Sequence, residues 1–480
     1  MSGQTTISRR DILRHGTAAI SSFAFGTAIT SRWARANPLG ANDRINVGVI
    51  GTGVRGKYLI GNLPETAQVT AICDCASSRM ADTLEPKKEF AEVLAGFRDD
   101  HAAHCRTYQD YRRMLDQEQL DAVIIATPDH HHVPAAMLAL EAGLDIYLEK
   151  PLSLTIREGR LLADMVKKTG CVLQVGSQQR TMEVNRFACE LIRDGGLGRV
   201  RRVDSPNYPG PIAHAYFSSE PIPEGFDWNL FLGPSPHRPH NRKLWVKDEF
   251  KVDGLLWRGW DLFRDYSGHL MTNWGAHNID MIQYALGMDH SGPVRIAPLN
   301  SDTIGNQQLD ISEAALERDW KEKWHKKTPR PSGSFSDSIR FRPITMEYAS
   351  GTVLNFLPGV PTATFYGEQG TMTISRNKFV TDPVDLIADG PDPTVTEKWK
   401  GSGFVARPHL QNWIDCIHSR NVPNAPVEVG HRSVTVCHLA NIVRELNRPL
   451  KWNPAEERFD DNEANTLLDR PRRKQFELPK

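Results

Sequence analysis

One glycine-rich stretch, residues 44–56, constrains the fold of this chain more than any other feature. It begins with a run rich in β-branched residues, Ile45 to Ile50, which suits a strand buried on both faces of a parallel sheet. The run ends in Gly51-x-Gly53-x-x-Gly56, and the residues after it have a helical pattern. In such a motif the first glycine makes a tight turn, the second lets backbone N–H groups approach a diphosphate, and the third lets helix and strand pack closely. The stretch therefore predicts a dinucleotide site at a helix N-terminus.

A second predicted strand supports this interpretation, because the glycine motif alone is a weak signal. Residues 69–74 are mostly apolar and end in Asp74, 18 residues after Gly56, where a carboxylate accepts hydrogen bonds from the adenosine ribose. The alternative is that Asp74 only caps the next turn. A carboxylate here would repel a 2′-phosphate, so the sequence favours NAD over NADP. The predicted cofactor contacts at this end of the site are Gly51, Thr52, Gly53, Val54, Arg55, Gly56 and Asp74.

The order of the predicted elements places the chain in the α/β class. Further apolar strands alternate with helical segments, which predicts a doubly wound parallel sheet, or Rossmann fold, over residues 37–177. These further strands are residues 121–127, 145–148 and 171–175. A chain of 480 residues is long enough for a second domain with a core of its own.

The character of the sequence changes after residue 177. Four strand-like runs predict an α+β second domain, residues 178–452, with an open, mainly antiparallel sheet. The runs are residues 346–348, 352–356, 362–365 and 371–374. We expect residues 453–480 to form a polar tail along the surface.

The first 36 residues have the pattern of an export signal. Ser8-Arg9-Arg10-Asp11-Ile12-Leu13 is a twin-arginine motif, a weakly apolar stretch follows it, and Ala34-Arg35-Ala36 resembles a cleavage site. The alternative is a solvated tail with a chance arginine pair. The pattern predicts recognition by the Tat export machinery and a periplasmic location. Because this route exports folded proteins, we also expect a tightly held cofactor that is acquired before export.

Composition excludes some partners. The formal net charge is zero and no basic run is longer than residues 472–474, so we expect no nucleic-acid partner. The seven cysteines are scattered and odd in number, which is typical of reduced, mostly buried thiols. No membrane-spanning segment is expected, because the apolar stretch of the signal is short and rich in glycine, serine and threonine.

A polar turn follows the strand at 121–127. It contains Thr127 and Pro128, which we expect to face the nicotinamide half of the cofactor, and three adjacent histidines that end at His132. Adjacent histidines cannot all ligate one metal ion from such a turn, and no carboxylate or thiolate cluster completes a site, so we expect no metal. Asp129, the first residue after Pro128, has a simpler interpretation as a helix cap.

The next strand ends in Glu149-Lys150-Pro151. A lysine beside bound NAD⁺ would be desolvated and repelled by the pyridinium, and both effects lower the pKa of its amine. Lys150 could then take the proton of a carbinol as hydride leaves for the nicotinamide. The alternative is a surface Glu–Lys pair of little energetic value.

A third polar cluster lies between residues 265 and 282. If its end is helical, Asn273, His277 and Asp280 share one face at positions i, i+4 and i+7. That face would present a neutral imidazole and polar neighbours to a cleft. A satisfied structural histidine is the alternative.

Together these residues resemble the Gfo/Idh/MocA oxidoreductases, the glucose–fructose oxidoreductase and inositol dehydrogenase group. The resemblance covers about residues 44–451 and rests on four motifs in the family's order. They are the Gly51-x-Gly53-x-x-Gly56 turn, the Ala126-Thr-Pro-Asp…His132 turn, Glu149-Lys150-Pro151 and the Gly275-x-His277 helix. With its twin-arginine signal the chain looks like the exported branch common in planctomycete-type bacteria.

The resemblance implies that Lys150 assists proton transfer and that His277 contacts the sugar hydroxyl being oxidised. It also implies that the outer face of the second sheet mediates homo-oligomers. The chain departs from the family pattern at Asn273, where the family usually has an aspartate, and an amide cannot hold a negative charge. We interpret Asp265 and Asp280 as possible substitutes for it.

These observations lead to three hypotheses. The first is an exported NAD-dependent oxidoreductase that acts on a CH–OH group of a sugar, polyol or glycoside, with Lys150, His277 and Asn273 as catalytic residues and Thr127, Pro128, His132, Glu149 and Lys150 as further cofactor contacts. The second is an NAD-dependent glycosidase or lyase that uses transient oxidation and elimination. The third is a catalytically silent sugar- or nucleotide-binding protein. We expect the tryptophan-rich stretch 228–260 to decide sugar specificity by stacking.

Overall fold

A computed structural model of the protein describes residues 44–87, 89–213, 217–245, 259–299, 303–304, 307–308, 342–387 and 406–479. The predicted export signal, residues 1–36, lies outside these ranges and stays a prediction. Part of the tryptophan-rich stretch, residues 246–258, lies outside them too. No helix in the described ranges is long and apolar enough to cross a membrane.

Six strands form a parallel sheet in the order β3-β2-β1-β4-β5-β6. The strands are β1 (Ile45–Ile50), β2 (Ala67–Cys73), β3 (Arg106–Tyr108), β4 (Ala122–Ile125), β5 (Asp145–Leu148) and β6 (Leu173–Val175). β1 and β4 pair at the centre, where the strand order reverses, and ligands of open parallel sheets bind beyond the carboxyl ends of strands at such a point. The predicted doubly wound parallel sheet is confirmed.

Helices and short 3₁₀ turns (η) connect these strands. They are α1 (Val54–Gly61), α2 (Ser77–Leu84), α3 (Glu89–Val93), α4 (Ala95–Asp100), η1 (Ala102–His104), α5 (Tyr111–Gln117), η2 (Asp129–His131), α6 (His132–Glu141) and α7 (Ile156–Thr169). The sheet is apolar on both faces. Val47 and Val49 of β1 belong to one core and Ile50 to another, so the strand is buried as its β-branched run predicts.

Two late helices complete these cores. α13 (Arg407–Ser419) contributes Leu410 and Trp413 to the core that contains Val47. α14 (Val427–Leu446) contributes Val427 and Val434 to the core on the other face. Residues far along the chain therefore fold against the first sheet.

The second sheet has nine strands in the order β15-β14-β13-β7-β12-β11-β8-β16-β17. Its strands are β7 (Arg202–Pro206), β8 (Pro293–Pro298), β11 (Ile344–Tyr348), β12 (Val353–Leu357), β13 (Ala363–Tyr366), β14 (Thr371–Ser375), β15 (Lys378–Asp382), β16 (Leu450–Asn453) and β17 (Arg458–Phe459). Its neighbours pair antiparallel except β7 and β12, which run parallel. The predicted mainly antiparallel sheet is confirmed, and its four predicted strands are β11 to β14.

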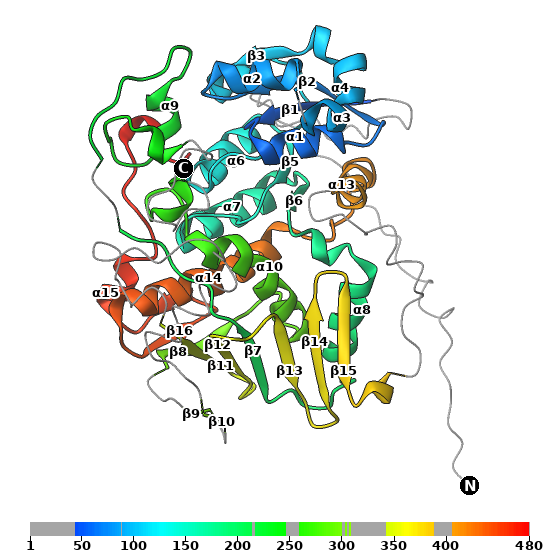
Figure 1. Cartoon of the computed structure of the whole chain (residues 1–480), viewed down its shortest axis with the longest axis vertical. Coiled ribbons are helices and arrows are strands. Elements are labelled where there is room, and N and C mark those ends of the chain that lie inside the picture. Colours follow the sequence, from blue (N-terminus) through cyan, green and yellow to red (C-terminus); the bar gives the residue numbers. More distant parts are fainter. Residues whose placement is uncertain are drawn as a thin grey trace, which may run out of the picture. The chain divides into compact units, whose positions relative to one another are not determined.

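The remaining described elements lie outside the two large sheets, and β9 and β10 pair with each other in a small separate sheet. They are η3 (Gln178–Arg180), α8 (Glu183–Arg193), α9 (Trp228–Leu232), η4 (Arg242–Leu244), η5 (Gly259–Leu262), α10 (His269–Ala285), β9 (Thr303–Ile304), β10 (Gln307–Gln308), η7 (Val384–Leu386), α15 (Asn462–Thr466) and η8 (Lys474–Phe476). Figure 1 shows α10 and α14 side by side, and α14 contacts both β6 of the first sheet and β8 of the second. α14 therefore joins the two sheets.

The C-terminal segment does more than follow the surface. Phe459 and Phe476 are buried. Arg470 and Arg472 both donate to Glu158 of α7, at 2.9 and 3.0 Å, across more than 300 residues of sequence. The segment is thus tied to α7 by two ion pairs.

Gly56 allows α1 to pack closely on the turn after β1. A Cβ atom at this position would lie 2.0 Å from the carbonyl oxygen of Gly51, closer than any real contact. By contrast, a Cβ atom at Gly96 in α4 would meet no atom within 4 Å. Both glycines lie in helices, so the two positions differ in how closely other atoms approach them.

We predict that Gly56→Ala lowers the free energy of unfolding by about 2–3 kcal/mol, because the helix must move away from the turn. The matched change Gly96→Ala should raise stability by up to about 1 kcal/mol, because alanine loses less backbone entropy than glycine when it enters a helix. Thermal unfolding of both variants measures the effects. Equal effects of the two changes would contradict the close packing of α1.

Candidate functional site

The glycine turn is held by Asp74 at the end of β2. Asp74 Oδ2 accepts hydrogen bonds from the backbone N–H of Thr52, at 3.0 Å, and from its hydroxyl, at 3.2 Å. Asp74 Oδ1 accepts from the backbone N–H of Ala76 at 3.0 Å. The buried carboxylate therefore supports the turn and also caps the backbone after β2.

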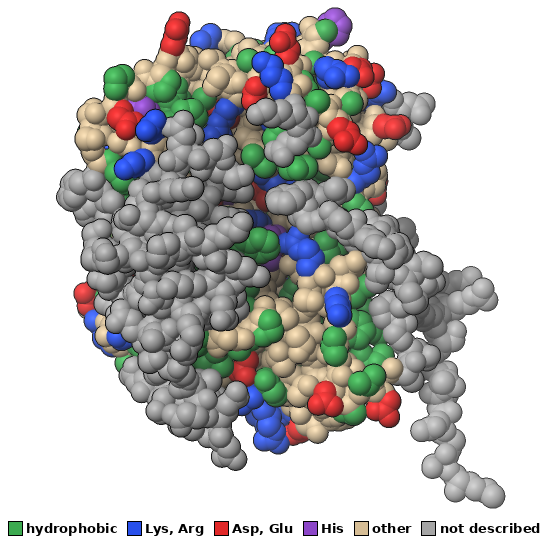
Figure 2. Space-filling view, viewed as in Figure 1, with side chains coloured by type: hydrophobic (Ala, Val, Ile, Leu, Met, Phe, Trp, Pro, Cys, Tyr) green, Lys and Arg blue, Asp and Glu red, His purple; other side chains and the backbone are tan. Residues whose placement is uncertain are grey.

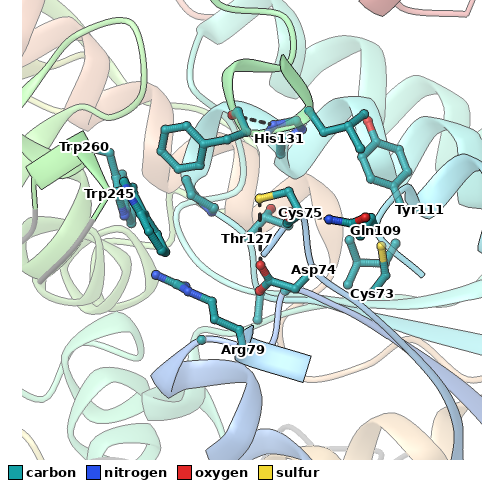
Figure 3. Close-up of a pocket in the computed structure, with 17 residues that line it drawn as sticks. Cys73, Asp74, Cys75, Arg79, Gln109, Tyr111, Thr127, His131, Trp245 and Trp260 are labelled. Atoms are coloured by element: carbon teal, nitrogen blue, oxygen red, sulfur yellow. Dashed lines mark hydrogen bonds between the residues drawn. The ribbon is translucent and has the colours of Figure 1, made fainter. Parts of the chain in front are cut away.

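A pocket opens beside this turn, at the carboxyl ends of the first sheet (Figure 3). Asp74 and Thr127 line it together with Gly51 and Gly53. Figure 3 shows Trp245 and Trp260 on another side of the pocket, with the guanidinium of Arg79 pointing toward Trp245. The pocket lining is Ile50, Gly51, Gly53, Cys73, Asp74, Cys75, Arg79, Gln109, Tyr111, Ala126, Thr127, Pro128, His131, Leu230, Phe231, Trp245 and Trp260.

Three tryptophans of the stretch 228–260 lie in the described ranges, namely Trp228, Trp245 and Trp260. Trp228 is buried and stacks on Phe231 at a centroid distance of 4.9 Å. The guanidinium carbon of Arg79 lies 5.3 Å from the ring centre of Trp245, a cation–π distance. Trp245 and Trp260 thus line the same pocket as Asp74, and a role of the stretch in sugar specificity stays a prediction.

The residues of this pocket fit a dinucleotide. Gly51 has a φ of 94°, and a Cβ atom there would lie 2.6 Å from the carbonyl oxygen of Ala126, so only glycine allows this turn. No side chain caps the N-terminus of α1 at Gly53, which leaves its backbone N–H groups for an anion. The backbone of residues 51–54 would hold the diphosphate, and Asp74 with Arg79 and Trp245 would border the adenosine.

Arg55 and Glu149 join the start of α1 to the end of β5. Arg55 Nε lies 2.6 Å from Glu149 Oε1. Burial lowers the pKa of Arg55, but the neighbouring Glu149 carboxylate outweighs this and raises it above its ordinary value. These two predicted cofactor contacts therefore form a charged pair at the edge of the site.

The histidine turn has a largely structural arrangement. Both ring nitrogens of His132 face backbone oxygens, that of Pro151 at 2.6 Å and that of Thr127 at 3.0 Å. His130 and His131 both lie within hydrogen-bond distance of the carbonyl oxygen of Phe231. Thr127 and Pro128 line the pocket, whereas His132 fixes their turn against residue 151. Within the described ranges, no group of three or more His, Cys, Asp or Glu residues could hold a metal ion.

Lys150 reaches from the first sheet to α10. Its Nζ donates to Oδ1 of Asn273 at 2.9 Å, and the peptide bond between Lys150 and Pro151 is cis. Asn273 Nδ2 in turn donates to Oδ1 of Asp261 at 3.3 Å. The amide of Asn273 therefore bridges an amine and a carboxylate.

His277 lies one helical turn beyond Asn273 on α10, as the i, i+4 spacing predicts. Burial lowers the pKa of His277 well below its ordinary value, and the positive charges of Arg376, Lys150 and Arg55 lower it further. Figure 2 shows a histidine and basic side chains together in a hollow of the described surface. The imidazole of His277 is therefore neutral beside Lys150.

The two carboxylates that the sequence offered as substitutes for the family aspartate are engaged elsewhere. Asp280 accepts from Arg180 Nε at 2.9 Å and from the hydroxyl of Ser433 at 2.8 Å. Arg180 also pairs with Asp289, so its role is structural. Asp265 forms an ion pair with Arg238.

The structure instead places another pair of buried carboxyl groups near Lys150, which the sequence analysis missed. Ser267 Oγ lies 2.8 Å from Asp129 Oδ2 and 3.1 Å from Asp261 Oδ1. Burial, and then the charge of Asp261, raises the pKa of Asp129 to about 8. No sequence spacing connects Asp129 with Asp261, because the contact depends on how two distant loops pack.

Comparison with known proteins agrees with this geometry. The model of the Gfo/Idh/MocA oxidoreductase family, NAD-binding Rossmann fold, matches residues 45–177. The model of the family's C-terminal alpha/beta domain matches residues 212–314 and 391–478. The first match defines an NAD-binding domain. Since the two matches together cover more than half of the chain, the protein belongs to the Gfo/Idh/MocA oxidoreductase family.

Curated relatives are similar to parts of the chain. A glycosyl hydrolase family 109 protein of Stenotrophomonas maltophilia is 23% identical over 49% of this chain and 48% of its own length. A levoglucosan dehydrogenase of Pseudarthrobacter phenanthrenivorans is 31% identical over 33% of this chain and 39% of its own length. An inositol 2-dehydrogenase/D-chiro-inositol 3-dehydrogenase of Lactiplantibacillus plantarum is 27% identical over 37% and 48%. The matches thus span about half or less of these relatives.

Solved structures share the fold. The WlbA dehydrogenase of Bordetella pertussis, in complex with NADH and UDP-GlcNAcA, has a TM-score of 0.55 and 16% identity, covering 86% of this chain and 99% of that chain. A levoglucosan dehydrogenase in complex with NADH and levoglucosan has a TM-score of 0.53 and 16% identity, over 85% and 99%. At this identity the likeness concerns the fold.

We predict that Asp129→Asn changes the pH dependence of stability. Between about pH 4 and pH 8 the folded protein holds a proton on Asp129 that the unfolded chain has lost, so the free energy of unfolding of the wild type falls as pH rises through this window. The variant lacks this contribution and should gain stability relative to the wild type from pH 4 to 8. Urea unfolding across pH 4–9 measures the free energy of unfolding of both proteins. The same pH dependence in wild type and variant would contradict the raised pKa of Asp129.

Proposed function

We propose that this protein is an exported oxidoreductase that transfers hydride between a tightly held NAD and a hydroxyl or keto group of a sugar, polyol or glycoside. The observation that carries the proposal is the meeting of Lys150 with Asn273 and the neutral His277 at the carboxyl end of β5. In an open parallel sheet this is the edge where ligands bind. The glycine turn and the Asp74 pocket lie at the same edge.

The proposed chemistry divides among three side chains. Lys150, as a neutral amine, takes the proton of the substrate hydroxyl, and it returns that proton when a ketone is reduced. The neutral imidazole of His277 hydrogen-bonds the same oxygen and orients it. Asn273 Oδ1 accepts from Lys150 Nζ and holds the amine in place. When bound, NAD supplies the acceptor or donor of the hydride.

The names of the relatives support the substrate class. Levoglucosan dehydrogenase and inositol 2-dehydrogenases act, by their names, on an anhydrosugar and on cyclic polyols. Both kinds of substrate carry secondary hydroxyl groups, which a lysine base and a neutral imidazole can serve. The exported location, recognition by the Tat machinery and a homo-oligomeric state belong to the same proposal and rest on the sequence.

A second function is supported by the relatives named glycosyl hydrolase family 109 proteins. Transient oxidation of a hydroxyl acidifies the neighbouring C–H bond, so that a glycosidic group can be eliminated as its alcohol. Water then adds to the double bond that this leaves, and the ketone is reduced again. The same three side chains would serve this reaction. Product analysis separates the two functions: net NADH formation supports the dehydrogenase, and bond cleavage without net redox change supports the glycosidase.

We predict that Lys150→Met lowers kcat/KM by about 100- to 10,000-fold on whichever member of a sugar and polyol panel is turned over, because the general base is lost. NADH absorbance and product analysis measure the effect, and Lys168→Met, at an exposed lysine of α7, is the matched control. Unchanged turnover in Lys150→Met would show that Lys150 is not the general base.

We also predict that Trp245→Ala weakens retention of NAD by about tenfold, because the indole and Arg79 border the adenosine end of the pocket. Nucleotide per protein, measured by absorbance and mass spectrometry after extensive desalting, reports the loss. Ile222→Ala, at an exposed residue outside this pocket, is the control. If the wild type itself releases its nucleotide freely, tight holding is wrong.

A further inference from the structure

The hydrogen bond from Lys150 to Asn273 is the start of a longer buried chain. Asn273 Nδ2 donates to Asp261 Oδ1 at 3.3 Å. The hydroxyl of Ser267 lies between Asp261 Oδ1, at 3.1 Å, and Asp129 Oδ2, at 2.8 Å. Asp129, Asp261 and Ser267 are buried. An unbroken line of polar contacts therefore connects the Lys150 amine to two carboxyl groups.

The number of hydrogens in this chain limits its charge. Ser267 Oγ already accepts the backbone N–H of His269 at 3.1 Å, which leaves one lone pair and one hydrogen. That hydrogen can be donated to only one of the two carboxylates. The other contact is favourable only if the second carboxyl group is protonated and donates to Ser267. The count of donors therefore assigns one proton to the pair Asp129–Asp261.

The same count indicates which carboxyl group is ionised. Asp261 Oδ1 accepts from Asn273 Nδ2 and lies 3.1 Å from the Ser267 hydroxyl, and His269 Nδ1 lies 3.3 Å from Asp261 Oδ2. Within this line of polar contacts, Asp129 is the last group, and its Oδ2 contacts the Ser267 hydroxyl. Burial raises the pKa of Asp129 to about 8. The proton therefore lies on Asp129, and the negative charge lies on Asp261.

The pair itself comes from two elements, Asp129 from η2 and Asp261 from η5. Two titratable groups face it: His269, which begins α10, and Lys150, which follows β5. His269 has a φ of 57°, a left-handed conformation that costs free energy in a non-glycine residue and that places its ring against Asp261. In its ammonium form Lys150 faces the pair as a cation, and that charge acts on Asp129.

We propose that Asp129 and Asp261 form a further acid–base unit of this site: a carboxyl pair that shares one proton and, through the amide of Asn273, places one negative charge behind Lys150. The pair stands in for the charge that Asn273 cannot carry. Asp129 and Asp261 are positioning residues, because they touch the Lys150 network and not the substrate. The catalytic consequence rests on the proposed function, whereas the charge and its effect on Lys150 do not.

The consequence concerns the proton that Lys150 receives. When the amine takes a proton from a substrate hydroxyl it becomes an ammonium ion, and the anion on Asp261 stabilises that form. Without the anion, the ammonium form loses a favourable interaction across two hydrogen bonds, and Lys150 gives up its proton at lower pH. The pair thus sets the pH at which Lys150 changes charge.

The test is the pH dependence of acetylation of Lys150 in the purified, nucleotide-bound protein. Limiting acetic anhydride is applied across pH 6–10, and the Lys150 peptide is quantified by mass spectrometry. We expect the half-labelling pH in Asp129→Asn/Asp261→Asn to fall by about one unit or more, so that labelling at pH 7.5 rises about tenfold. Asp265→Asn is the matched control, because Asp265 pairs with Arg238 outside the pair, and it should leave the half-labelling pH unchanged.

An unchanged half-labelling pH in the folded double variant would overturn the proposal. If the double variant does not fold, infrared spectra at pH 6 decide with the wild type and Asp129→Asn alone. The carbonyl band of one protonated carboxyl group should be present in the wild type and lost in Asp129→Asn, and equal bands in the two proteins would overturn the shared proton.

Failure of the proposed function is distinguishable from failure of this proposal. A shifted half-labelling pH together with full turnover in Lys150→Met would keep the carboxyl pair and remove the oxidoreductase mechanism. An unshifted half-labelling pH together with inactive Lys150→Met would keep the mechanism and remove the pair.

Discussion

The hydrogen bond between Lys150 and Asn273 connects the two parts of this fold, and the arrangement of the site depends on it. Lys150 follows a strand of the parallel sheet, and Asn273 lies on α10, whose apolar side chains belong to the core of the second sheet. The contact would be lost if the sheets shifted relative to each other. α14, which contacts both sheets, and the C-terminal arginines on Glu158 hold the fold in the register that keeps amine and amide at 2.9 Å.

The electrostatics of the site follow from burial around this contact. Burial and three nearby cations keep His277 neutral, so it can serve as a hydrogen-bonding partner at any physiological pH. On the other side of Asn273, the carboxyl groups of Asp129 and Asp261 both lie within hydrogen-bond distance of the Ser267 hydroxyl. Two carboxyl groups so close together do not both ionise easily, because their charges repel. The amide of Asn273 therefore separates a cationic half of the site from an anionic half.

Local patterns were enough to predict part of this arrangement. The glycine motif, Asp74 at the end of the second strand, and Lys150 after a buried strand are each read from adjacent residues, and Asn273 with His277 follows from helical spacing. Asp261 was not predictable, because its contact with Asn273 requires the loop before α10 to fold back on the helix. Likewise Arg470 contacts Glu158 across 312 residues of sequence. α13 packs on the first sheet although it lies more than 200 residues after the last strand of that sheet. Such contacts depend on tertiary packing, which periodicity and spacing do not encode.

The central claim is that a bound nucleotide lies across the tip of β1 with its reactive ring near Lys150. An experimental structure of the protein purified with its own nucleotide tests this most directly, through the position of Lys150 Nζ relative to the nicotinamide. We expect the amine to lie on the substrate side of the ring, with room for one hydroxyl-bearing carbon between them. A crevice filled by side chains, or an amine turned away from the ring, would contradict it.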